Sequence, residues 1–162
     1  MSRVSSQQPL LPSVLDRLID TEPDVSSEPA WRQTQSLREF EASVLRDLEV
    51  LLNTRQARPE LARERGELSQ SLLTFGLPDF SSIGIGHQTE REQLRQVIDE
   101  TIRRFEPRLK QVSITLREPE NALDSTLRLS IDALLWIDPQ PEPISFDTIV
   151  RPSSGQCTVK SR

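Results

Sequence analysis

The chain has 162 residues and a net charge of −5, with acidic and basic side chains interspersed along it. A chain of this length can bury the core of one domain, and the absence of a basic stripe argues against binding to nucleic acid. One cysteine leaves no partner for an internal disulfide, and one histidine disfavours a zinc site or a catalytic triad. The longest apolar run, Ala133–Ile137, is far too short to span a membrane, and we expect no signal peptide.

The N-terminal part, residues 1–33, is predicted to be a flexible arm and linker. Residues 1–12 are polar and are expected to stay disordered until a partner orders them. Val14–Ile19 has the spacing of a short amphipathic helix, too short to be stable alone, and partner docking is slightly favoured for it. A linker rich in proline and acidic residues follows at Thr21–Pro29. Trp31 beside it either anchors the linker to the domain or is held for a partner.

Two longer helices are predicted in the remaining domain, residues 34–162. Ser36–Glu39 matches a capping box, in which the serine and glutamate side chains bond to backbone N–H groups at the helix start. The apolar stripe that follows predicts a helix ending near Asn53 or Thr54. A second capping box, Thr89–Glu92, is expected to open a helix that runs to Phe105. Between the two helices the sequence is loop-like.

The C-terminal third alternates apolar and polar residues with the period of a β-strand. Strands are predicted at Gln111–Arg117, Thr126–Ile137, Ile144–Val150 and Gln156–Lys160, the last two joined by a hairpin loop at Pro152–Gly155. Helices followed by strands predict an α+β fold, a small antiparallel sheet with helices packed on one face and a C-terminal β-hairpin.

Two features of these strands bear on function. From Ala133 to Ile137 both faces of the strand are apolar, which indicates either a central strand buried at its far end or a surface covered by another chain. Trp136 is expected in the core or at the end of the sheet. Cys157 is expected to be a buried small residue and His87 an exposed turn residue, so neither is assigned a chemical role.

Glu106, Pro107 and Arg108 lie between the second helix and the first strand. Proline cannot continue the helix, so the acid and the base stand at a stiff corner. One interpretation is a local ion pair that only shapes the corner, worth about 0–1 kcal/mol if exposed. The other is a partner-binding site, where truncating a desolvated pair can cost about 2–5 kcal/mol. If the second holds, alanine variants should leave the melting temperature nearly unchanged and weaken binding.

Several stretches together resemble the TssE family, baseplate subunits of the type VI secretion system that are homologous to a phage-tail baseplate wedge protein once labelled an acidic lysozyme. The matching stretches, in the family's order, are Leu11–Leu18, Arg46–Arg55, Phe75–Phe80, Phe105–Leu109 and Phe146–Thr148. The resemblance covers nearly the whole chain, and its Leu-Leu-Asn-Thr-Arg and Gly-Leu-Pro-Asp-Phe stretches are the specific ones.

The resemblance implies a structural protein in a cytoplasmic baseplate at the inner face of the inner membrane. Its implied partners are the wedge proteins TssF, TssG and TssK and the sheath proteins TssB and TssC, with a role in linking wedge to sheath and starting sheath assembly. The Glu106-Pro107-Arg108 motif is implicated in contacts within the wedge core. The edge of the C-terminal hairpin is the expected place for an added sheath strand, and deleting Gly155–Arg162 is expected to leave the domain folded.

The alternative is a lysozyme-like enzyme that cleaves peptidoglycan. That chemistry needs two carboxyls about 5–10 Å apart, one of them kept protonated by an apolar pocket. Glu106 is the best candidate because Phe105 precedes it, yet Arg108 would lower its pKa, the wrong direction for a general acid. We therefore expect no catalytic residues, no metal and no cofactor.

Overall fold

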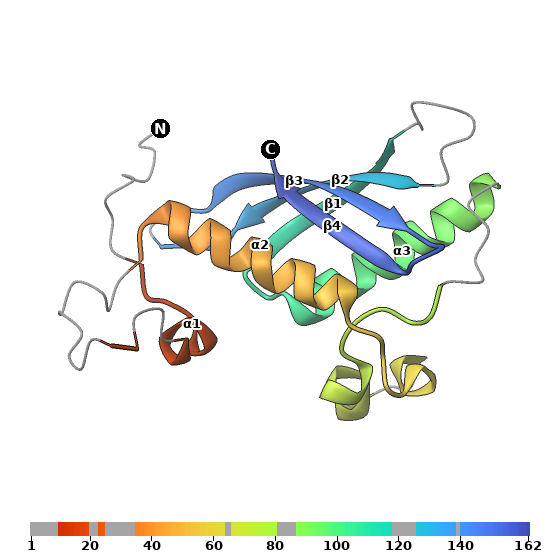
Figure 1. Cartoon of the computed structure of the whole chain (residues 1–162), viewed down its shortest axis with the longest axis horizontal. Coiled ribbons are helices and arrows are strands. Elements are labelled where there is room, and N and C mark those ends of the chain that lie inside the picture. Colours follow the sequence, from red (N-terminus) through yellow and green to blue (C-terminus); the bar gives the residue numbers. More distant parts are fainter. Residues whose placement is uncertain are drawn as a thin grey trace.

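The computed structural model describes residues 10–19, 23–24, 35–63, 66–80, 87–117, 126–138 and 140–162. Its elements, in chain order, are the helices α1 (Val14–Leu18) and α2 (Leu37–Asn53), the short 3₁₀ helices η2 (Pro59–Arg63), η3 (Glu67–Gln70) and η4 (Leu72–Thr74), helix α3 (Gln88–Phe105), and the strands β1 (Leu109–Arg117), β2 (Leu127–Leu135), β3 (Glu142–Arg151) and β4 (Gln156–Ser161) (Figure 1). Trp31, residues 1–9 and most of the predicted linker lie outside the described residues.

The four strands form one antiparallel sheet in the order β1-β2-β3-β4. Ile114 of β1 lies opposite Ile131 of β2, which in turn lies opposite Phe146 of β3, so the apolar positions of neighbouring strands share one face. β3 and β4 make the predicted hairpin through the turn at residues 152–155. The predicted α+β fold with an antiparallel sheet is confirmed.

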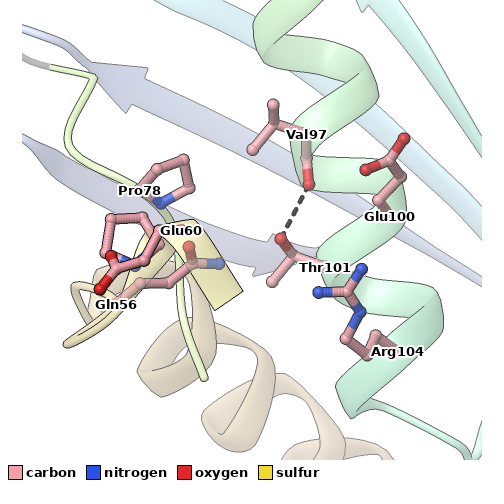
Figure 2. Close-up of a pocket in the computed structure, with 8 residues that line it drawn as sticks. Gln56, Glu60, Pro78, Val97, Glu100, Thr101 and Arg104 are labelled. Atoms are coloured by element: carbon pink, nitrogen blue, oxygen red, sulfur yellow. Dashed lines mark hydrogen bonds between the residues drawn. The ribbon is translucent and has the colours of Figure 1, made fainter. Parts of the chain in front are cut away.

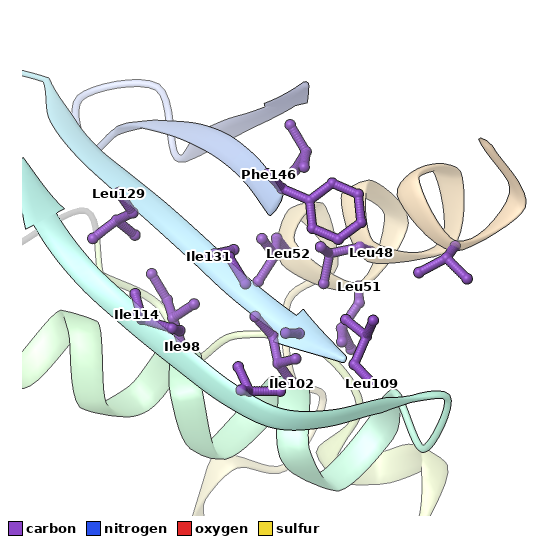
Figure 3. Packing of buried hydrophobic residues seen from close by; sticks show 14 of the residues in the cluster. Leu48, Leu51, Leu52, Ile98, Ile102, Leu109, Ile114, Leu129, Ile131 and Phe146 are labelled. Carbon is purple, nitrogen blue, oxygen red and sulfur yellow. The ribbon is translucent and has the colours of Figure 1, made fainter. Parts of the chain in front are cut away.

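The core lies between the sheet and the two long helices. α2 packs along β4 and α3 along β1, both on the apolar face of the sheet. Figure 3 shows Leu48, Leu51 and Leu52 of α2 and Ile98 and Ile102 of α3 directed at the strand residues Leu109, Ile114, Leu129, Ile131 and Phe146. The opposite face of the sheet carries polar and charged side chains, including an Arg117–Asp147 ion pair at 3.3 Å.

The N-termini of α2 and α3 can be compared with the two capping boxes predicted from the sequence. Ser36 and Glu39 form the predicted capping box: the Ser36 Oγ accepts from the Glu39 N–H at 3.4 Å and the Glu39 carboxylate accepts from the Ser36 N–H at 2.7 Å. The second predicted cap is wrong. α3 begins at Gln88, and His87 stands at the N-cap with an extended backbone and no side-chain cap bond. Its carbonyl already accepts from the Arg91 N–H at 3.2 Å, which draws Thr89 into the first turn.

The edge of β4 is more closed than predicted. Cys157 and Val159 are buried against α2. The Asn53 side-chain amide donates to the Cys157 carbonyl at 2.8 Å and accepts from the Cys157 N–H at 2.9 Å, as a neighbouring strand would. Lys160 to Arg162 remain exposed. The expected deletion of Gly155–Arg162 would remove two core residues, so it would not leave the domain intact.

The two most specific stretches of the resemblance pack against each other. After α2, the Leu77 N–H donates to the Thr54 carbonyl at 2.9 Å and the Gln56 N–H to the Leu77 carbonyl at 3.0 Å. Gly76 has a φ of 98°, and a Cβ there would lie 2.3 Å from the Thr54 carbonyl oxygen, so only glycine fits. Arg55 stacks over Phe80 at 4.4 Å from its ring centre. These contacts join the end of α2 to the segment that precedes α3.

The structure shows the degree of burial of the three single residues discussed above, His87, Cys157 and Trp136. His87 is exposed, as predicted. Cys157 is buried, as predicted, and burial raises the pKa of its thiol to about 11. Trp136 lies just past the end of β2 and is 63% exposed, so of its two expected places the end of the sheet is correct and the core is not. Leu135 and Ile137 on either side are buried, which means that the alternation continues and leaves Trp136 on the other face.

Candidate interaction site

The corner between α3 and β1 is built by the last turn of α3 and the proline that follows it. Glu106 is the C-cap residue, and its N–H donates to the Ile102 carbonyl at 2.8 Å. Pro107 then ends the helix because it has no N–H to donate, and its side chain is exposed. Arg108 follows, and β1 starts at Leu109. The predicted stiff corner is therefore present.

Glu106 and Arg108 form a two-pronged ion pair inside this corner. The Arg108 Nε donates to the Glu106 Oε1 at 2.7 Å and the Arg108 Nη2 to the Glu106 Oε2 at 2.5 Å, while the Arg108 N–H also donates to Oε1 at 3.2 Å. The Glu106 side chain is 5% exposed and that of Arg108 is 20% exposed. Sequence reasoning allowed an exposed pair, whereas the structure buries the acid almost completely.

The ion pair continues into α2 and α1. Arg108 Nη2 also contacts the Asp47 Oδ2 at 2.7 Å, and the Arg46 Nη2 contacts both the Asp47 Oδ1 at 2.8 Å and the Asp16 Oδ1 at 2.7 Å. Glu106, Arg108, Asp47, Arg46 and Asp16 thus form a continuous row of alternating charges, which we call the charged row. It ties together the α3–β1 corner, α2 and α1.

Sequence reasoning did not single out Asp47, Arg46 or Asp16. The available signal was their presence in two of the stretches that carry the family resemblance, Leu11–Leu18 and Arg46–Arg55. Nothing in the spacing of those stretches says that they meet at the corner, since Asp47 and Arg108 are 61 positions apart.

The pKa values of Arg108, Arg46 and Asp16 are all shifted in the direction that favours their charged forms. Burial favours the neutral form of Arg108, but hydrogen bonds and ion pairs with Glu106 and Asp47 outweigh it and raise the pKa of the guanidinium above its usual range. Burial would also raise the pKa of Asp16, but hydrogen bonds from Ser13 and Arg46 lower it overall. Because Asp16 is 4% exposed and Arg46 is 41% exposed, a guanidinium faces outward at the α1 end of the row.

Trp136 lies beside the corner. Its backbone N–H donates to the Arg108 carbonyl at 2.7 Å, so the backbone of Trp136 is fixed beside the residue that follows Pro107. A largely exposed tryptophan is a residue of the kind enriched at protein–protein contacts. The sequence did not predict that Trp136 is exposed, because this residue lies within the apolar run Ala133–Ile137.

A hollow of about 410 Å³ lies between α3 and the segment after α2 (Figure 2). Its lining includes the carboxyls of Glu60 and Glu100, the candidates there for acid–base chemistry. The pKa of Glu60 is lowered by backbone hydrogen bonding and by Arg58, the wrong direction for a general acid. A carboxyl whose pKa is raised, Glu41, lies outside this hollow. The hollow therefore gives no support to the enzyme alternative.

The described part of the chain shows neither a metal-binding cluster nor a membrane-spanning helix. No group of three or more His, Cys, Asp or Glu side chains is placed to hold a metal ion among those residues. Within the same residues, none of the helices has the length and apolar character that crossing a bilayer demands.

Comparison with known proteins gives two findings. A family model described as "Baseplate wedge protein gp25" matches residues 38–140, a range that contains α2, α3, the corner and β2. A solved chain titled "The baseplate complex from the type VI secretion system" is similar in structure with a TM-score of 0.49 and 21% sequence identity, over 70% of this chain and 95% of that chain. No curated protein sequence matches.

Proposed function

This chain belongs to the gp25 family of baseplate wedge proteins, structural components of a baseplate, and we propose that it serves in the baseplate of a type VI secretion system. In this proposal it links the wedge proteins TssF, TssG and TssK to the contractile sheath of TssB and TssC, and starts sheath assembly. The baseplate stands in the cytoplasm at the inner face of the inner membrane. The observation that carries the proposal is the family match over residues 38–140, joined to the sequence stretches that resemble TssE.

The corner at Glu106, Pro107 and Arg108 is the proposed wedge contact. Glu106 is too buried to meet a partner directly, so its role here is to hold Arg108 in place. Pro107 and the exposed part of Arg108 are the groups that reach a neighbouring subunit. Trp136 extends the same contact, because it is bonded to the Arg108 carbonyl and is largely exposed. A rigid corner suits this role, since little conformational entropy is lost on docking.

Binding to purified TssF, TssG and TssK tests the wedge contact. Trp136→Ser should weaken binding about tenfold or more, as expected for an interface tryptophan, with little change in melting temperature because the side chain is exposed. Leu72→Ser is the matched control, since Leu72 is also highly exposed but lies on η4. Equal binding by both variants would contradict a contact at this corner.

The sheath contact is proposed for the exposed end of β4. Asn53 bonds both backbone groups of Cys157, so these point away from β3; by strand alternation the N–H and carbonyl of Ser161 point the same way. Ser161 is exposed, unlike Cys157 and Val159. An extended segment of a sheath subunit added here would bond to these backbone groups.

Two variants at one position test the sheath contact. Ser161→Pro removes the outward N–H, whereas Ser161→Ala keeps it and changes only the side chain. Sheath assembly from purified baseplate and sheath proteins should fall with the proline variant and persist with the alanine variant. Normal sheath yield from Ser161→Pro would refute strand addition at this edge.

The proposed role involves no catalysis. A turbidity assay on purified cell walls checks this directly, with Glu106→Gln as the matched variant because Glu106 was the best candidate acid. Cell-wall cleavage that disappears in that variant would overturn the structural role in favour of the enzyme alternative.

A further inference from the structure

Helix α1 presents its apolar side chains to the outside. Leu11, Val14, Leu15 and Leu18 are 52% to 80% exposed, and no residue of α1 is buried. These four residues, with Arg17 and Arg46 at their rim, are called the α1 surface below. Exposed large apolar residues concentrated in one short segment mark a contact surface more often than a solvated one.

The segment is held in this orientation by its polar side. In the helix, Asp16 stands roughly opposite the apolar residues, and its carboxylate bonds to the Arg46 guanidinium of α2 at 2.7 Å. Ser13 closes a capping box with the same carboxylate, Oγ to Oδ2 at 2.6 Å. Just before the helix, Leu10 exchanges two backbone hydrogen bonds with Gln35. α1 is thus fixed beside α2, away from the sheet (Figure 1).

The spacing of the exposed residues indicates what covers them. Val14, Leu15 and Leu18 follow the one-, three- and four-residue steps that place side chains on one face of α1, and Leu11 lies just before the N-cap at Ser13. An exposed apolar stripe on a short helix is complemented by the apolar stripe of another helix, which packs its side chains between those of the first.

The charges at the rim indicate the polarity of the occupant. Arg17 is exposed on α1, and Arg46 is 41% exposed, whereas the carboxylate between them, Asp16, is covered. Arg17 and Arg46 therefore place two positive charges beside the apolar residues. An occupant with acidic side chains flanking its apolar stripe would complement them.

We propose that the α1 surface binds an amphipathic helix of another subunit, one that carries acidic residues beside its apolar stripe. Taking that subunit to be a wedge protein rests on the function proposed above. The charged row joins Asp16 to the Glu106–Arg108 corner through Arg46 and Asp47, so the α1 surface and the corner are placed relative to each other by fixed ion pairs. One partner can therefore contact both the α1 surface and the corner, and neither of them has to become ordered on binding.

The test uses the full chain and three sets of variants. The first, Leu11→Gln with Val14→Gln and Leu18→Gln, removes the apolar stripe. The second, Leu68→Gln with Leu72→Gln, is the matched control, because these leucines are also exposed but belong to η3 and η4. The third, Arg17→Glu, reverses the charge at the rim. All are exposed residues, so melting temperatures should stay within error of wild type.

Affinity for the purified TssF–TssG assembly, measured by calorimetry at two salt concentrations, is the readout. The stripe variant should bind at least about tenfold more weakly, the control variant should bind like wild type, and Arg17→Glu should bind more weakly with the larger loss at low salt. Wild-type affinity in the stripe variant would contradict the proposed binding at the α1 surface, but it would not contradict the proposed role as a wedge protein. If the wild type binds no wedge protein at all, the proposed function itself fails.

Two further measurements separate other occupants. Sedimentation of the wild type alone would reveal self-association that the stripe variant abolishes, which would make a second copy of this chain the occupant. Co-sedimentation with neutral phosphatidylcholine vesicles, lost in the stripe variant, would identify a lipid surface. Either result would overturn the proposal of an acidic amphipathic helix.

Discussion

Replacing Glu106 by glutamine tests whether the corner is held by its buried ion pair. The change keeps the size of the side chain and removes its charge, which leaves Arg108 facing Asp47 alone. Removing one partner of a buried pair typically costs about 3–5 kcal/mol. Arg108 is one-fifth exposed and keeps Asp47, so we expect a smaller loss, roughly 2–3 kcal/mol in the free energy of unfolding. This replaces the sequence-based expectation of a nearly unchanged melting temperature.

Urea unfolding and thermal melting measure this loss. For a domain of this size the melting temperature should fall by about 4–12 °C, and the urea midpoint should fall with an unchanged slope. Glu92→Gln is the control, because Glu92 is 41% exposed and pairs with Arg95 within α3, so its loss should lower the melting temperature much less than the loss of Glu106 does. Equal stability of the two variants would refute the claim that the charged row holds the corner.

Three further outcomes are expected. Hydrogen bonds from Ser13 and Arg46 lower the pKa of Asp16 below its ordinary value of 3.8, so its contribution to α1 docking is fully present above that value and lost as the pH falls through the folded pKa; the protection of the α1 amides, taken as the observed exchange rate relative to the intrinsic rate at each pH, should fall at acid pH in the wild type and be low at every pH in Asp16→Asn. Gly76→Ala should lower the urea midpoint more than Gly66→Ala, because both glycines have positive φ but a Cβ at Gly76 meets the Thr54 carbonyl while one at Gly66 meets nothing; equal losses would contradict the close approach. The Cys157 thiol, whose pKa is raised to about 11, should react with a thiol reagent at pH 8 only as the protein unfolds, and rapid reaction of the native protein would contradict its burial.

Local chemistry in the sequence determined most of the elements. The Ser36–Glu39 cap sets the start of α2 because its bonds form within one turn. Pro107 ends α3 because it has no N–H to donate. Strand alternation placed β2, β3 and β4 to within a few residues. β1 likewise begins two residues before the predicted Gln111, where a bulge between Lys110 and Ser113, with Gln111 at a φ of 50°, breaks the two-residue period.

Tertiary structure alone decided how the surfaces of the protein are used. The Arg108–Asp47 and Asn53–Cys157 contacts join residues 61 and 104 positions apart, and both depend on how α2 docks against the rest of the fold. They bury the acid of the corner and close most of the β4 edge. The exposure of Trp136 could not be predicted from its apolar run, because such a run has the same sequence whether one face of the strand or both faces are covered. Periodicity records which side chains avoid water within one element, whereas the packing of elements decides which apolar side chains remain for a partner.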